Sequence, residues 1–186
     1  MSEDFQIEID ATETLGKLRQ LDGRLKNMTP VFQDIGEIIK TSVIKNFEVG
    51  GRYDRAGSWK GGSRKWRPLS AVTLFGQTEG RGGTRRKGNK FFKKSGALSK
   101  RGERRLNRKI LVGPGGHLVN SINWQADRDS VAIGTNRVYA AIHQFGGKAG
   151  RNKKVTIPAR PYMVVQDEDL VEINAVLEDY LTKPFN

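Results

Sequence analysis

The chain has 186 residues, no cysteine and a formal net charge of +13, and 36% of its residues are hydrophobic. This length predicts one domain with a real core, and the low hydrophobic fraction predicts that part of the chain lies outside that core. The absence of cysteine excludes disulfides, thiolate zinc sites and cysteine nucleophiles. The chain begins without a basic, apolar leader and contains no apolar run of about 20 residues, so we expect a soluble protein made in a cytoplasm.

The N-terminal part of the chain predicts a strand followed by a helix. Apolar and polar residues alternate over Phe5–Asp10, which is the pattern of a strand with one buried face. A helix is expected next, with Thr12 or Thr14 as its cap. The apolar residues that would form its buried side are Leu15, Leu18, Leu21, Leu25 and Met28.

A second helix is predicted by stronger signals. Thr29 and Pro30 form a cap followed by a proline in the first turn, and the Gly50-Gly51 pair predicts the end of the helix. Apolar residues recur every three or four positions between these ends, so one side of the helix should be buried. These residues are Phe32, Ile35, Ile39, Val43 and Phe47.

The segment 50–109 has a different composition from the rest of the chain. It holds 19 Lys and Arg residues against three acids, a net charge of +16, whereas the remaining residues carry a net charge of −3. Glycine clusters replace helical periodicity, apart from one helical turn expected at Ser70–Phe75, with Trp66 and Leu69 packing back onto the core. A long loop of this kind indicates either a function or disorder.

The remaining segments predict short elements in close succession. We expect a strand at Ile110–Val112, a hairpin of 121–126 and 130–134, a helix at 139–145 and a β-rich tripeptide at Val155–Ile157 that ends at a proline. A last helix should open at Asp167–Asp169, where acids suit the helix dipole. Its buried side would consist of Leu170, Ile173, Leu177 and either Tyr180 or Leu181.

The predicted fold class is therefore α+β. We expect a small, mostly antiparallel sheet with two N-terminal helices and one C-terminal helix, in a single domain of residues 1–186. Residues 50–109 would form a long basic loop insertion in this domain.

No residue pattern predicts an enzyme. The tract 83–89 approaches a phosphate-binding loop, but Asn89 stands where that loop needs a lysine. His117 and His143 are the only imidazoles, and neither has the spacing of a metal ligand set or of a nucleophile–base pair. We therefore expect no catalytic, cofactor-binding or metal site, and we interpret His143 as a hydrogen-bonded structural residue beside a packed Phe145.

The basic insertion has three possible interpretations. It could be a solvated loop, a surface for the DNA phosphate backbone, or a surface that docks on acidic faces of neighbouring subunits. Its aromatic residues would either stack on bases or pack on protein, and they are Tyr53, Trp59, Trp66, Phe91 and Phe92. The candidate contact residues are Arg64, Lys65, Arg67, Arg81, Arg85, Arg86, Lys87, Lys90, Lys93, Lys94, Arg101, Arg104 and Arg105.

Arg160 stands between two prolines in the turn Ile157-Pro-Ala-Arg-Pro161. A guanidinium on such a fixed turn could be directed at a carboxylate for bidentate pairing, or it could be solvated. Both alternatives are compatible with the sequence.

Several short motifs in a fixed order carry a resemblance to a known family. They are Trp66-Arg-Pro-Leu-Ser70, Ile110-Leu-Val112, Leu118-Val-Asn-Ser-Ile122, Tyr139-Ala140, Ile142-His-Gln-Phe-Gly-Gly147 and Ile157-Pro-Ala-Arg-Pro-Tyr162. With these motifs the chain resembles the Mu-like phage virion morphogenesis family, also called the tail completion or tail protein S family. The motif residues of most interest are Trp66, Tyr139, His143, Gln144, Phe145, Gly146, Pro158, Arg160 and Pro161.

The resemblance implies a structural virion protein that acts in tail completion or head–tail joining. Related neck and tail-end proteins form rings around the DNA path, so it implies a ring-forming homo-oligomer, with a hexamer favoured, at the neck or tail end of the virion. Its partners would be other neck or tail proteins, with packaged double-stranded DNA as a further candidate and no membrane involved. The length and basicity of 76–105 depart from the family, so family features there do not transfer. The alternative is a stand-alone nucleic-acid-binding protein that uses the basic insertion.

Overall fold

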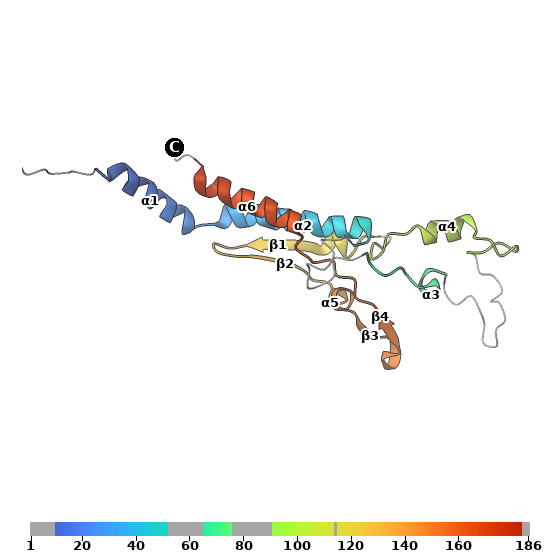
Figure 1. Cartoon of the computed structure of the whole chain (residues 1–186). Coiled ribbons are helices and arrows are strands. Elements are labelled where there is room, and N and C mark those ends of the chain that lie inside the picture. The colour runs from blue at the N-terminus through green and yellow to red at the C-terminus, as the bar shows by residue number, and fades with distance from the viewer. Residues whose placement is uncertain (1–9, 52–64, 76–90, 114, 184–186) are drawn as a thin grey trace, which may run out of the picture. The chain divides into compact units, whose positions relative to one another are not determined.

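The computed structural model describes residues 10–51, 65–75, 91–113 and 115–183 (Figure 1). The described helices are α1 (Thr12–Leu25), α2 (Thr29–Val49), α3 (Ala71–Phe75), α4 (Lys100–Leu106), α5 (Ala140–Phe145) and α6 (Asp167–Thr182), with short 3-10 turns at Val119–Ser121 and Arg151–Lys153. The described strands are β1 (Ile122–Ala126), β2 (Val131–Thr135), β3 (Gly147–Ala149) and β4 (Val155–Ile157). The predicted α+β class is confirmed, and these strands form two separate antiparallel pairs, β1–β2 and β3–β4, rather than one sheet.

The described residues divide into two compact units. Unit 1 contains 10–40, 124–133 and 167–183, and unit 2 contains 41–123 and 134–166 without the residues outside the description. Helix α2 and the β1–β2 hairpin therefore contribute residues to both units. The single-domain organisation stays a prediction.

Helix α2 confirms the strongest sequence prediction. It begins at Thr29 and ends at Val49, before Gly50 and Gly51, which both have positive φ angles. Glycine suits this end because it adopts the left-handed conformation without steric strain. The buried side of the helix consists of Val31, Ile35, Ile39, Val43 and Phe47, together with the polar residues Ser42 and Asn46. Phe32, which was predicted on this side, is only partly buried.

The start of α2 is held by Asn27 rather than by the predicted threonine cap. The side-chain oxygen of Asn27 accepts hydrogen bonds from the backbone N–H and the hydroxyl of Thr29, at 3.3 and 2.7 Å. The backbone N–H of Met28 donates to the carbonyl of Arg128 in the β1–β2 turn, at 3.0 Å. The entry into α2 is therefore fixed to the hairpin within unit 1.

Helix α1 forms where predicted, but its predicted buried side is wrong. No residue of α1 is buried, and Leu15, Leu18 and Leu25 are about half exposed. Neither Thr12 nor Thr14 caps the helix, because the N-cap position is Ala11, which makes no side-chain cap. Leu21 and Met28 of the predicted side are partly buried.

The β1–β2 hairpin packs its tryptophan on α2. The indole N–H of Trp124 donates to a carboxylate oxygen of Glu37 at 2.9 Å. A Cβ atom at Gly36 would lie 2.5 Å from the Trp124 ring, so only glycine allows this close approach. The hairpin closes through a hydrogen bond from the Asp127 N–H to the Ser130 carbonyl, as the predicted turn requires.

Helix α6 starts at the predicted triple acid, but its buried side differs from the prediction. Leu170 is 49% exposed, whereas the neighbouring Asp169 is buried. The C-terminal turn of the helix is attached through Tyr180, whose hydroxyl donates to the Asn27 carbonyl at 3.0 Å and whose own carbonyl accepts from Arg24 at 2.7 Å. Its exposed side is acidic.

Two further predictions of strands have different outcomes. The strand expected at Ile110–Val112 is wrong, because Leu111 has a φ of +61° that breaks an extended conformation. The strand expected at Phe5–Asp10 lies outside the described residues, apart from Asp10 itself. The tripeptide Val155–Ile157 is confirmed as β4, and it pairs with β3 in antiparallel register.

Candidate functional site

The residues that the sequence singled out occupy two different regions of unit 2. The family motif residues lie around the 160–163 segment, and the described members of the cationic set lie at 65–67 and 93–105. Arg64, Arg81, Arg85, Arg86, Lys87 and Lys90 lie outside the described residues, as do Tyr53 and Trp59.

The 160–163 segment is held by side chains from three distant parts of the sequence. The indole N–H of Trp66 donates to the Pro161 carbonyl at 2.8 Å, and the amide of Asn46 donates to the Tyr162 carbonyl at 2.9 Å. Trp66 also packs edge-on against Phe47, with ring centroids 5.6 Å apart. This segment runs through the core without a partner strand, so side chains satisfy its backbone groups.

The side chain of Gln144 makes hydrogen bonds that a partner strand would otherwise make. Its side-chain oxygen accepts hydrogen bonds from the backbone N–H groups of Tyr162 and Met163, at 2.9 and 3.1 Å, and its N–H2 group donates to the Met163 carbonyl at 3.1 Å. A single carboxamide thus pairs with three backbone groups, because glutamine carries both donors and acceptors. We call Asn46, Trp66, Gln144, Arg160 and Tyr162 the clamp.

Arg160 is neither solvated nor directed at a carboxylate of the described chain. Its Nε and Nη2 atoms both donate to the carbonyl oxygen of Arg67, at 3.2 and 3.1 Å, and the residue is only 5% exposed. Burial, and then the charge of Arg67, lower the pKa of Arg160. The motif arginine therefore attaches the Trp66–Arg67 segment to the turn between the two prolines.

Tyr162 forms the centre of the clamp. It is 1% exposed, its ring lies 5.1 Å from that of Phe47, and its hydroxyl donates to the Ala140 carbonyl at 3.3 Å. Burial raises the pKa of this hydroxyl. The short helix α5 is thereby held against the segment that follows β4.

His143 and Phe145 differ in part from their predicted roles. The His143 carbonyl accepts the Arg160 N–H at 2.7 Å, but its Nδ1 atom is buried without a hydrogen-bond partner among the described residues. Burial, and then the charge of Arg160, lower the pKa of His143, which favours the neutral ring. Phe145 is 78% exposed, so the prediction that it packs beside His143 is wrong.

Gly146 explains why the motif requires glycine after Phe145. Its φ is +75°, and a Cβ atom there would lie 2.8 Å from the backbone nitrogen of Ala159. Both the left-handed conformation and the close backbone approach exclude a side chain. This glycine allows α5 to end directly against the β4–160 turn.

The segment 91–109 is ordered, which the sequence did not predict. Phe92 and Leu98 form an antiparallel bridge, and Ser99 then caps α4 by accepting the Gly102 N–H at 3.2 Å. The signals for this helix were Ser99 and the acid Glu103 in its first turn, and the surrounding basic residues and glycines concealed them.

Aromatic packing attaches this segment to α3. The Phe75 ring lies 5.9 Å from Phe91 and 5.2 Å from Phe92, and Arg105 donates to the Leu74 carbonyl at 2.7 Å. Phe91 and Phe92 are half-buried, and Trp66 is 4% exposed. Of the two predicted roles for these three aromatic residues, the structure therefore favours packing on protein over stacking on bases.

The charged side chains of this segment face solvent. Apart from Arg105, whose guanidinium lies 5.4 Å from the Phe91 ring centre, the basic residues at 93–109 are exposed. We call five of these residues the cationic face: Lys93, Lys94, Arg101, Arg104 and Arg108. None of them takes part in an ion pair between described residues.

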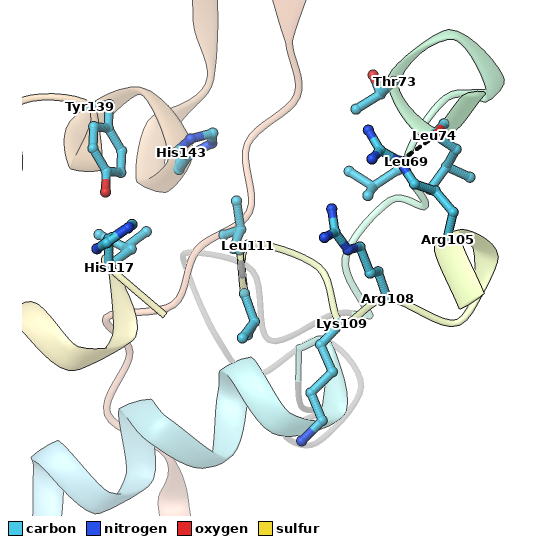
Figure 2. A pocket seen from close by; sticks show the side chains of 13 residues that line it. Leu69, Thr73, Leu74, Arg105, Arg108, Lys109, Leu111, His117, Tyr139 and His143 are labelled. Carbon is cyan, nitrogen blue, oxygen red and sulfur yellow. Dashed lines mark hydrogen bonds between the residues drawn. The ribbon is translucent and has the colours of Figure 1, made fainter. Parts of the chain in front are cut away.

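A cavity of about 360 Å³ lies between this segment and α5 within unit 2 (Figure 2). Arg105 and Arg108 line one side, Tyr139 and His143 line the other, and Leu111 lies between them. Figure 2 shows the Tyr139 hydroxyl pointing toward His117. The lining contains no carboxylate and no serine, and its polar side chains are Thr73, Arg105, Arg108, Lys109, His117, Tyr139 and His143.

The described residues contain no group of three or more histidine, cysteine or acidic side chains arranged to hold a metal ion. Among the same residues, no helix has the length and apolarity required to span a bilayer.

Comparison with known proteins identifies the family. A model of the phage virion morphogenesis family matches residues 84–182. The chain is 30% identical over 177 residues to Mu-like prophage FluMu G protein 2 of Haemophilus influenzae, which covers 95% of each chain. It is also 43% identical over 49 residues to the putative capsid assembly protein G of Escherichia phage Mu, covering 26% of this chain and 31% of that protein.

No solved structure matches the chain. The family match includes α4, α5, α6 and three of the five clamp residues. It supports a phage structural or morphogenesis role and association with the virion. The family model matches more than half of the chain, and the Haemophilus influenzae protein matches nearly its whole length. The protein therefore belongs to the phage virion morphogenesis family.

Proposed function

We propose that this protein is a structural subunit that completes the tail or joins head and tail in a tailed-phage particle. It would act as a homo-oligomeric ring around the DNA path, with a hexamer favoured, at the neck or tail end of the virion. The observation that carries the proposal is membership of the virion morphogenesis family, supported by the relative of phage Mu whose name describes capsid assembly.

The clamp and the cationic face would have different roles. The clamp fixes the backbone of the core, and the cationic face presents charge to a partner. This partner would be a neighbouring subunit, another neck or tail protein, or packaged double-stranded DNA. In this proposal the role is mechanical rather than catalytic, as the virion morphogenesis family suggests.

A second candidate function is stand-alone nucleic-acid binding, which the +16 charge of segment 50–109 favours. Mass photometry of the purified chain with and without duplex DNA separates the two. Oligomers of defined size that form without DNA support the structural proposal. Monomers that bind DNA with a log–log salt slope of about −5, as expected for about six phosphate contacts, support the alternative.

The direct test uses a tailed phage that encodes this protein. We expect deletion of its gene to give full-length tails and filled heads that remain unjoined or incomplete in electron micrographs. Complementation with the wild-type chain should restore joined particles. Normal infectious particles without the protein would overturn the proposal.

A further inference from the structure

We infer that the acidic side of α6 in one copy docks on the cationic face of the next copy, head to tail. This inference rests on the proposed ring, and it names the two surfaces that would form the contact between subunits. Each surface is described within its own unit, and the pairing is between different molecules.

The exposed side of helix α6 carries acidic residues and no basic residues. The helix carries six acidic residues and no lysine or arginine. Residues spaced three and four apart share one side of a helix, and one such row is exposed here. We call this row the acidic face: Val171, Glu172, Ala175, Glu178 and Asp179. Its three carboxylates take part in no ion pair between described residues.

The cationic face carries the opposite charge, and its backbone is held by specific contacts. Segment 91–109 carries eight basic residues and one acid. A bridge between Phe92 and Leu98, the Ser99 cap and the Arg105–Leu74 hydrogen bond hold its backbone in one conformation. An ordered array of charge loses less conformational entropy on docking than a flexible arm does, so it suits a specific protein surface.

Both faces also expose apolar side chains beside their charges. Val171 on α6 is 69% exposed, Leu106 on α4 is 52% exposed and Val72 on α3 is 63% exposed. Protein interfaces combine apolar contacts with complementary charge at their rim. Duplex DNA exposes phosphates but little apolar surface. These apolar residues therefore favour a protein as the binding partner.

The charges disfavour a contact between like faces of two copies. In a two-fold contact that brought α6 of one copy against α6 of the other, carboxylates would oppose carboxylates, and the cationic faces would repel in the same way. A head-to-tail contact pairs opposite charges at every interface and closes into a ring when the rotation between subunits allows. A two-fold contact in which each acidic face meets the cationic face of the other copy matches the charges equally well, so the size of the oligomer separates a dimer from the ring that we propose.

Two charge-reversal variants test this pairing. The first is Glu172→Lys with Glu178→Lys, and the second is Arg101→Glu with Arg104→Glu, all at exposed positions. Alone, each variant places like charges on both sides of the contact, so we expect its self-association to weaken at least tenfold. In an equimolar mixture, each interface again joins opposite charges, so oligomers should return with the two variants alternating.

Matched controls change the net charge equally at other exposed positions. Asp127→Lys with Asp129→Lys and Arg151→Glu with Lys154→Glu should assemble like the wild-type chain. Mass photometry at low salt measures the oligomers, and circular dichroism verifies that each variant is folded. Raising the salt to about 0.5 M should weaken the mixed oligomers, because a shorter Debye length screens exposed charges.

The outcomes separate this inference from the proposed function. Wild-type-like assembly of each variant alone, or a mixture that does not assemble, would overturn the pairing. If the Arg101/Arg104 variant loses duplex binding but assembles normally, DNA occupies the cationic face and the pairing is again wrong. The ring proposal survives those results if the wild-type chain assembles, and it fails separately if phage without the protein builds normal particles.

Discussion

The clamp and the cationic face belong to the same unit but use polar side chains in opposite ways. In the clamp, Trp66, Gln144 and Arg160 direct their polar groups inward, at backbone atoms of distant segments. On the cationic face, Arg101 and Arg104 are exposed, and the guanidinium of Arg101 lies 5.9 Å from the Phe91 ring centre. Mutations in the clamp should therefore change stability, and mutations on the face should change assembly.

Truncation of the clamp tryptophan should have the largest effect on stability. Trp66→Ala removes a buried ring and leaves the Pro161 carbonyl without its donor, so we expect unfolding to require about 3–5 kcal/mol less free energy. Urea denaturation followed by circular dichroism measures the loss. Val72→Ala, at an exposed position, serves as the control and should change stability by less than about 0.5 kcal/mol. Equal effects would show that Trp66 does not support the core.

Removal of the motif carboxamide should have a somewhat smaller effect. Gln144→Ala leaves the backbone groups of Tyr162 and Met163 without partners, so we expect a loss of about 1–3 kcal/mol. Gln125→Ala on the exposed side of β1 is the matched control and should be nearly neutral. Hydrogen exchange should show faster exchange of the Tyr162 and Met163 amides in Gln144→Ala alone. Unchanged exchange would contradict the clamp.

Two glycine-to-alanine variants test whether the backbone under the cationic face is fixed. A Cβ atom at Gly102 would overlap the Phe91 carbonyl oxygen, so Gly102→Ala should destabilise the protein by about 1–3 kcal/mol. Gly16 in α1 has open space around it, and Gly16→Ala should instead stabilise the protein by about 0.5–1 kcal/mol. Thermal unfolding of both variants gives the comparison. A stabilising Gly102→Ala would mean that α4 is not packed as described.

The stability of the protein should also depend weakly on pH through His143, which precedes the clamp residue Gln144. Its pKa is lowered by burial and by Arg160, so the folded state binds this proton less readily than the unfolded state. Stability from this group is therefore present above about pH 6.5, the ordinary histidine value, and decreases as the pH falls below it. Denaturation between pH 5 and 8 should show a smaller pH dependence in His143→Asn than in the wild-type chain. An equal dependence in both proteins would contradict this assignment.

The cationic face should tolerate substitution with the smallest change in stability. Arg104→Ala removes an exposed charge, so we expect the free energy of unfolding to change by less than about 0.5 kcal/mol. The same variant should weaken assembly or DNA binding measurably by mass photometry. A large loss of stability would mean that Arg104 belongs to the core rather than to a docking surface.

Local sequence signals determined much of this protein. The apolar spacing from Ile35 to Phe47 and the glycines after Val49 define α2, and the turn residues 127–129 define the β1–β2 hairpin. The ordered motifs also identified the family correctly, because motif order is a property of the chain itself. These features depend on neighbours a few residues apart.

Only the tertiary structure decided what the motif residues do. Gln144 and Arg160 were recognised as motif residues, but their acceptors and donors lie at Tyr162, Met163 and Arg67, and the sequence gives no distance between them. Asn46 was missed, although a polar residue on the buried side of α2 is a signal for a specific buried hydrogen bond. Leu15 and Leu18 follow a perfect helical spacing and are exposed, because periodicity predicts which residues share a side but not whether anything covers it.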